Sequence, residues 1–128
     1  MRILLDTHIF LWHISGDERM PSAFRSTIQD PSNEVFLSIA SVWEAVIKYS
    51  LGKLPLPESP ADYLPRQREK HRIASLVIDE LTFPYLARLP NLHRDPFDRI
   101  LIAQCLSNRL TLATVDPQVM AYAVPVLH

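Results

Sequence analysis

HRDPFDRILIAQCLSNRLTLATVD, residues 93–116, reads as a helix followed by a buried strand. Pro96 suits the first turn of a helix, and apolar side chains recur at helical spacing after it. The run from Leu110 to Ala113 is short and β-rich, as in a strand that is buried on both faces. The stretch therefore predicts a helix over residues 96–109 that leads directly into a strand of a sheet.

The same alternation extends outward over the rest of the chain. Further β-rich runs lie at residues 3–5, 35–37, 76–78 and 124–127, and helix-like segments lie at 21–30, 39–51, 59–71, 80–88 and 117–122. Parallel strands need a crossover that passes over one face of the sheet, and a helix usually supplies it. The sequence thus predicts an α/β fold with a parallel sheet of about five strands and helices on both sides.

Length and composition indicate one ordinary domain. The chain has 128 residues, which suits a single domain over 1–128, and its 48% hydrophobic and 21% charged residues are typical of a soluble globular protein. Asp6 and His8 interrupt the apolar run over residues 1–13, so we interpret this run as a first strand rather than a signal peptide. Cys105 is the only cysteine, which excludes an internal disulfide, and we expect a cytoplasmic protein.

Several functional classes lack their motifs here. The net charge of -1 gives no overall basic surface, so any role with nucleic acid must rest on a local patch or on a metal ion. Gly16 and Gly52 are the only glycines, which excludes the glycine-rich motifs of dinucleotide-binding, P-loop and serine-hydrolase proteins. The five histidines have no spacing that would form a zinc-binding pair.

Two aspartates follow predicted strands. Asp6 ends the run RILLD, and Asp116 comes shortly after the strand in TLATVD. Ligands bind open parallel sheets at the carboxyl ends of the strands, where both residues would lie. Each can also be a helix cap, Asp6 before Thr7 and Asp116 before Pro117, and for either residue alone the cap is the favoured interpretation.

Glu44 lies in a predicted helix with an apolar stripe. Ile39, Val42, Trp43, Val46 and Ile47 share the stripe, while Glu44 lies on the other side with Ser41 and Lys48. The sequence alone favours a solvated face on which Glu44 and Lys48 form an i,i+4 pair, contributing roughly 0.2 to 0.5 kcal/mol.

The two aspartates in HRDPFDR have different explanations. Asp95 before Pro96 fits a helix N-cap. Asp98 lies on the apolar stripe of its helix and needs a partner, for which Arg94, a backbone N-H of the first turn and a metal ion are all suitable. Arg99 can pair with Asp95 at i,i+4.

If Asp6, Glu44, Asp98 and Asp116 meet at one edge of the sheet, their mutual repulsion should raise some of their pKa values unless a cation lies among them. Clusters of carboxylate oxygens suit Mg²⁺ or Mn²⁺. Such an ion activates water and stabilises charge on phosphorus, so the hypothesis that follows is metal-dependent hydrolysis of phosphodiesters.

Four stretches carry a family resemblance. LLDTHIFLW, the glutamate in SIASVWEAVIK, HRDPFDRILIAQC and TLATVD resemble, in order and spacing, the PIN-domain ribonucleases, especially the VapC-like toxins of type II toxin-antitoxin pairs. The resemblance covers essentially the whole chain. By the family pattern, the catalytic and metal-binding acids would be Asp6, Glu44, Asp98 and Asp116. Possible accessory residues are Thr7 and Thr114, which match the hydroxyl residues beside the first and last acids, and Asp95, which matches a subfamily feature.

The resemblance also implies a fold, an activity and partners. It implies a three-layer α/β/α sandwich, a Mg²⁺ or Mn²⁺ cofactor, and endonucleolytic cleavage of RNA that leaves a 5′-phosphate. It further implies a homodimer and a small antitoxin protein that occupies the site. On position alone, Arg94 and Arg99 are the best candidates for RNA contact, whereas the basic residues 66–72 are more simply a solvated helix face.

Two other interpretations remain open at this point. A receiver-like signalling domain would also have a parallel sheet with acids at strand ends, and Asp79 would be its phosphoacceptor, but the paired acids after the first strand are missing. A non-catalytic interaction module would keep the fold and bind only a protein partner. His93 lies close to the proposed site, although a loop residue before the helix cap is its simpler interpretation.

Overall fold

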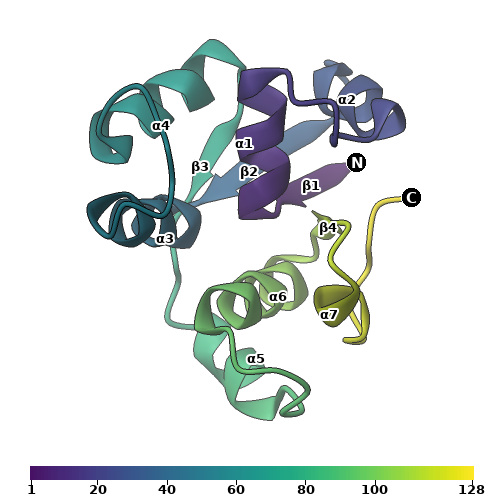
Figure 1. Cartoon of the computed structure of the whole chain (residues 1–128). Coiled ribbons are helices and arrows are strands. Elements are labelled where there is room, and N and C mark those ends of the chain that lie inside the picture. Colours follow the sequence, from purple (N-terminus) through teal and green to yellow (C-terminus); the bar gives the residue numbers. More distant parts are fainter.

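The computed structural model describes all residues, 1–128, as seven helices around one sheet (Figure 1). In chain order the elements are β1 (Arg2–Leu5), α1 (Thr7–Ser15), α2 (Ser22–Gln29), β2 (Glu34–Ser38), α3 (Ile39–Ser50), α4 (Pro60–Lys70), β3 (Ala74–Leu76), α5 (Thr82–Arg88), α6 (Pro96–Asn108), β4 (Thr111–Ala113) and α7 (Pro117–Met120). No helix is long and apolar enough to cross a membrane.

The sheet is fully parallel, with strand order β3-β2-β1-β4. Ile3 of the central strand β1 pairs with Val35 on one side and with Thr111 on the other. Because every strand runs in the same direction, all four carboxyl ends lie along one edge of the sheet. The residue that follows each strand therefore lies at this edge.

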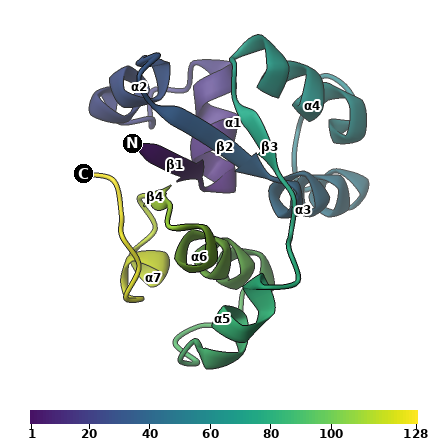
Figure 2. The same cartoon turned by 180° about the vertical axis from the view of Figure 1, so that it is seen from behind.

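Alternate side chains of the sheet enter two separate cores. Ile3 and Leu5 pack on one face with apolar residues of α1, α2 and α4, whereas Leu4 packs on the other face with residues of α6 and α7. Successive side chains of a strand point to opposite faces, so one short apolar strand serves both cores. The predicted three-layer arrangement is thus confirmed, and Figure 2 shows the strands from the side opposite α1.

The structure corrects two expectations about the elements. Residues 124–127 form no strand, since Val126 makes only an isolated bridge to Leu112, and the sheet has four strands rather than about five. Residues 7–13 belong to helix α1 and do not continue the first strand. Their apolar, aromatic and β-branched side chains are equally suited to a strand, and packing on the sheet selects the helix.

A buried pair of side chains connects the sheet to α3 and α6. Ser38 is the last residue of β2, and its Oγ accepts a hydrogen bond from the Ala40 N-H, which caps α3. The same hydroxyl donates to Oε1 of Gln104 on α6 at 2.5 Å. Gln104 is fully buried, and its Nε2 donates to the Val77 carbonyl at 3.1 Å. These bonds hold the start of α3, and hence Glu44, against α6.

Replacing this hydroxyl should destabilise the domain. Ser38→Ala removes the α3 cap and leaves Oε1 of buried Gln104 without its donor, so we expect a loss of about 1 to 3 kcal/mol of unfolding free energy. Urea denaturation measures this loss. Ser26→Ala is the matched control, because Ser26 is exposed and bonds only within α2; it should change stability by less than about 0.5 kcal/mol. Equal stability of the two variants would contradict the role of Ser38.

Candidate active site

Asp6 and Asp116 lie next to each other because β1 and β4 are paired. Asp6 occupies the N-cap position of α1, but its side chain makes no cap bond; Oδ2 instead accepts a hydrogen bond from the Thr114 hydroxyl at 2.7 Å. Asp116 does cap α7, since its Oδ1 accepts from the Gln118 N-H at 2.9 Å. The cap interpretation is therefore wrong for Asp6 and confirmed for Asp116.

Glu44 approaches the same edge from α3. It is only 4% exposed, and its Oε2 accepts from Lys48 Nζ at 2.6 Å. The i,i+4 pair is as predicted, but the solvated face is not, because Ser41 and Glu44 are both buried. α3 instead exposes much of its apolar stripe, including Trp43 at 59%. The small side chains of Ala40, Ser41 and Ala45 allow this face of α3 to approach the rest of the domain.

Asp95 and Asp98 lie at the start of α6 and have different hydrogen-bond partners. Asp95 is the N-cap, and its Oδ1 accepts from the Phe97 and Asp98 N-H groups at 2.9 and 3.2 Å. Asp98 has a partner that sequence reasoning missed, since its Oδ2 lies 3.0 Å from Nε2 of His93. The only signal for this contact was the position of His93 in the same short motif.

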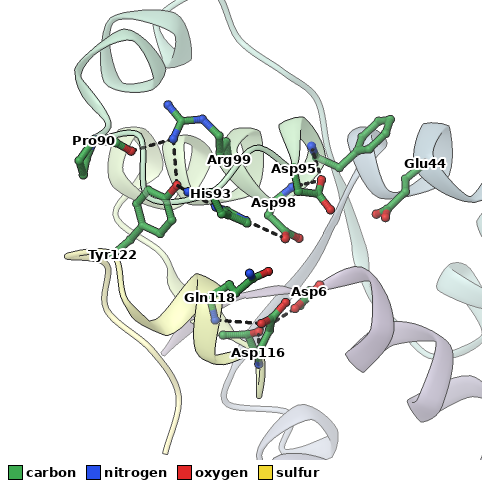
Figure 3. A network of polar contacts seen from close by, with 12 residues as sticks. Asp6, Glu44, Pro90, His93, Asp95, Asp98, Arg99, Asp116, Gln118 and Tyr122 are labelled. Carbon is green, nitrogen blue, oxygen red and sulfur yellow. Dashed lines mark hydrogen bonds and ion pairs between the residues drawn. The ribbon is translucent and has the colours of Figure 1, made fainter.

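The carboxylates converge in space, as Figure 3 shows. Asp6, Asp98 and Asp116 point into one space between α6 and α7, and Glu44 approaches it from α3. Asp95 lies beside Asp98 at the start of α6 and faces Glu44. The structure therefore brings together all four acids that the family resemblance proposed, together with Asp95.

The acids perturb one another electrostatically. Burial raises the pKa of Asp6, and the charges of Glu44 and Asp116 raise it further against the opposing hydrogen bond from Thr114. Burial, with the nearby charges of Asp95 and Asp6, raises the pKa of Asp98 to about 6 although the His93 contact lowers it. Such shifts in neighbouring groups are typical of functional sites.

Lys48 is the protein's own cation at this edge. Burial works against its charge, but the hydrogen bond to Glu44 and the charges of Glu44, Asp95 and Asp98 outweigh burial and raise the pKa of Lys48. Its ammonium group neutralises Glu44 directly, whereas Asp6 and Asp98 have no such ion pair with lysine or arginine.

The donor set suits a hard divalent cation. Each of the four acids has one oxygen bonded to a protein donor, namely Thr114 Oγ1, Lys48 Nζ, His93 Nε2 or the Gln118 N-H, and its second oxygen makes no protein hydrogen bond. No three acidic or histidine side chains lie close enough together to hold an ion directly as they stand. Mg²⁺ usually binds through one or two carboxylates and keeps several waters, so the arrangement fits such an ion.

The other residues singled out from the sequence lie around this site or away from it. The Thr7 hydroxyl donates to Ser41 Oγ at 2.8 Å, which joins α1 to α3 and does not reach an acid. Arg99 does not pair with Asp95, because its guanidinium donates to the Pro90 carbonyl and to the Tyr122 hydroxyl. Arg94 is exposed beside the site, in a hollow that it lines with His93 and Arg99.

Two features from the sequence lie elsewhere. Residues 66–72 precede β3, so this basic segment is at the amino ends of the parallel strands, opposite the acids. Asp79 follows the edge strand β3 and is exposed, and its Oδ1 accepts from the Leu81 N-H at 2.8 Å. Strand β2 separates it from the paired ends of β1 and β4, which is unlike the central phosphoacceptor that a receiver needs.

Because burial raises the pKa of Asp98, this carboxyl should destabilise the metal-free protein near neutral pH. The folded pKa of about 6 exceeds the unfolded value of 3.8, so the stability that Asp98 contributes is complete below pH 3.8 and is lost as the pH rises through 6. In EDTA, Asp98→Asn should therefore be more stable than the wild type by about 1 to 2 kcal/mol at pH 7.5, after discounting for solvent screening, and equally stable near pH 3.5. Denaturant unfolding across this pH range measures the difference.

Asp30→Asn is a control with the opposite sign. Hydrogen bonds from Ser32 lower the pKa of Asp30, so this variant should be less stable than the wild type at neutral pH, and the difference should shrink as the pH falls through the folded pKa. A constant difference for Asp98→Asn at all pH values would contradict the burial of its charge.

Comparison with known proteins identifies the fold and the family. The family model described as PIN domain matches residues 3–124. A curated relative, Ribonuclease VapC16 from Mycobacterium tuberculosis, is 44% identical over 55 residues; the match covers 43% of this chain and only 39% of the length of that relative.

Solved structures share the architecture at low sequence identity. A chain in the crystal structure of VapBC2 from Rickettsia felis bound to a DNA fragment from their promoter has a TM-score of 0.74 and 15% identity, covering 100% of this chain and 98% of that chain. A chain of VapBC-1 from nontypeable Haemophilus influenzae has a TM-score of 0.67 and 20% identity, covering 94% and 90%. With a family match across nearly all residues, the chain belongs to the PIN domain family.

Proposed function

We propose that this chain is a metal-dependent endoribonuclease, the toxin of a toxin-antitoxin pair. The observation that carries the proposal is the convergence of Asp6, Glu44, Asp98 and Asp116, each with one oxygen free of protein donors. The PIN domain match, the similarity to a protein named as a ribonuclease and the fold shared with VapBC structures support it.

The acids would hold Mg²⁺ or Mn²⁺ through their free oxygens. When bound, the ion lowers the pKa of a coordinated water and stabilises the charge that develops on the phosphate. The protein's contribution is to keep the carboxylates oriented and partly buried. Asp95, whose Oδ1 is occupied by the α6 cap bonds, would act mainly by positioning Asp98.

RNA would be bound by local charge, because the net charge of -1 attracts no polyanion by itself. Arg94 is exposed, directly precedes Asp95 and has no ion pair. Arg99 is committed to Pro90 and Tyr122, so of the two arginines Arg94 is the better candidate for direct phosphate contact.

A small antitoxin protein and a second copy of the chain are the proposed protein partners. The exposed apolar side chains of α3, among them Ile39, Trp43 and Val46, support at least one such contact, since contiguous apolar surface of this kind commonly marks an interface. A non-catalytic PIN module would use the same surface; it would lack nuclease activity and would not bind Mn²⁺.

Removal of either an acid or the metal should abolish RNA cleavage. Purified protein with Mn²⁺ should cut total RNA and leave 5′-phosphate ends, and EDTA should stop the reaction. Asp6→Asn and Asp98→Asn should each reduce the rate by at least about 100-fold while remaining folded, because each loses a charged ligand. Mapping the cut ends by sequencing identifies the RNA target in the same experiment.

Asp79→Asn is the matched acid control and should cleave at the wild-type rate, because Asp79 is exposed and follows the edge strand β3 rather than the paired strands β1 and β4. Cleavage by Asp98→Asn at an undiminished rate in EDTA would contradict the proposal. Absence of both cleavage and Mn²⁺ binding in the wild type would favour the non-catalytic module.

Arg94→Ala should weaken RNA binding without altering the chemistry. We expect KM to rise by about 3- to 10-fold and kcat to change little, with the defect shrinking at high salt, since loss of one phosphate contact reduces the salt dependence by about one ion. Initial rates at several KCl concentrations measure this effect. Lys53→Ala, an exposed charge in the loop after α3, is the control, and an equal defect in that variant would argue against a specific contact.

A further inference from the structure

The His93 side chain lies between Asp98 and Tyr122, a residue that the proposed function does not use. This side chain is only 7% exposed, and its Nε2 lies 3.0 Å from Asp98 Oδ2. Its Nδ1 lies 2.8 Å from the Tyr122 hydroxyl, and the two rings pack edge to face with their centroids 5.3 Å apart. The Tyr122 hydroxyl in turn lies 2.9 Å from Nη1 of Arg99 (Figure 3).

The donors around Tyr122 determine which nitrogen of His93 carries the proton. Arg99 can only donate, and the His93 backbone N-H also points at the Tyr122 hydroxyl, at 3.3 Å. These two donors use the acceptor capacity of the phenolic oxygen, so its own proton is donated to Nδ1 of His93. Nδ1 is then the acceptor, Nε2 carries the hydrogen, and the Nε2-H donates to Asp98.

The chain of hydrogen bonds closes on itself. Arg99 follows Asp98 in α6, and its guanidinium is also anchored by the Pro90 carbonyl at 2.8 Å. The path from Arg99 through Tyr122 and His93 therefore returns to the neighbouring residue of the same helix. Every member has a fixed direction of donation, which restricts rotation of the Asp98 carboxylate.

We propose that His93 is a positioning residue for Asp98: the Nε2-H holds Oδ2, so that Oδ1 is the oxygen presented to the cation. This inference rests on the proposed function, because it assigns Asp98 to a metal. Tyr122 and Arg99 act one step further out by holding the imidazole in the required tautomer. Groups that orient a metal ligand in this way commonly change metal affinity by 10- to 100-fold when they are removed.

Two substitutions of His93 distinguish the positioning role from simple packing. If His93 only filled space, its ring against Tyr122 would suffice, and a phenylalanine would replace it well. The positioning role requires a donor beside Asp98 Oδ2 instead. His93→Gln places an amide N-H on a side chain of similar reach, whereas His93→Phe keeps an aromatic ring and removes the donor.

Nitrogen NMR of the imidazole tests the tautomer without any metal. In the metal-free protein, His93 should carry its hydrogen on Nε2, and Tyr122→Phe should convert it to a mixture of tautomers. A wild-type protein with the hydrogen on Nδ1 would overturn the proposal, because Nε2 could not then donate to Asp98.

Calorimetry with Mn²⁺ and RNA cleavage test the consequence on folded samples of each variant. His93→Phe should weaken Mn²⁺ binding by about 10- to 100-fold, and His93→Gln should stay within about 3-fold of the wild type. Thermal unfolding of both variants separates these losses from instability. Equal Mn²⁺ affinity of His93→Phe and the wild type, or equal losses in the two variants, would overturn the role of His93. A wild type that neither binds Mn²⁺ nor cleaves RNA would overturn the proposed function itself.

Discussion

The crowding of carboxylates at one edge of a parallel sheet is the constraint on which the rest of this structure depends. Asp6 and Asp116 follow hydrogen-bonded neighbouring strands, so the β1-β4 ladder itself brings them together. Burial raises the pKa of Asp6, and the charges of Glu44 and Asp116 raise it further, so ionisation of Asp6 is costly. A domain retains such an arrangement where it serves a function, since stability alone would favour its removal.

The surrounding residues orient the carboxylates but leave most of their charge unpaired. Thr114, Lys48, His93 and the Gln118 N-H each hold one oxygen of a different acid, and only Lys48 brings a full ion pair. The donors come from the loop after β4, from α3, from the loop before α6 and from α7. Residues from four parts of the chain thus orient carboxylates that would otherwise turn away from one another.

Burial of Glu44 has its own structural consequence. α3 turns its small and polar side towards α6 and the sheet, which leaves Trp43 and its apolar neighbours on the surface. Hydrophobic burial by itself would favour the reverse orientation. The bonds of Ser38 to Gln104 and to the start of α3 help to hold the helix in the observed orientation. The site and the exposed apolar surface are therefore two results of one helix orientation.

Local signals made much of the fold and part of the site predictable. The Asp95-Pro96 and Asp116-Pro117 helix starts depend on hydrogen bonds that span two or three residues, and the structure confirms both predictions. The alternation of strands and helices likewise predicted the parallel sheet. The same local patterns did not identify α1, whose apolar run suits either a strand or a helix until it packs on the sheet.

The sequence by itself determined the α/β architecture and the helix starts, because these follow from periodicity and from contacts within a few residues. The four acids were selected as a set by the family resemblance. Only the tertiary structure decided which oxygen each acid leaves free, that Glu44 is buried, and that His93 joins Asp98 to Tyr122. His93 and Tyr122 are 29 residues apart, and Thr114 and Asp6 are 108 apart. Contacts over such separations exist only once strand order and helix orientation are set, and no local pattern encodes them.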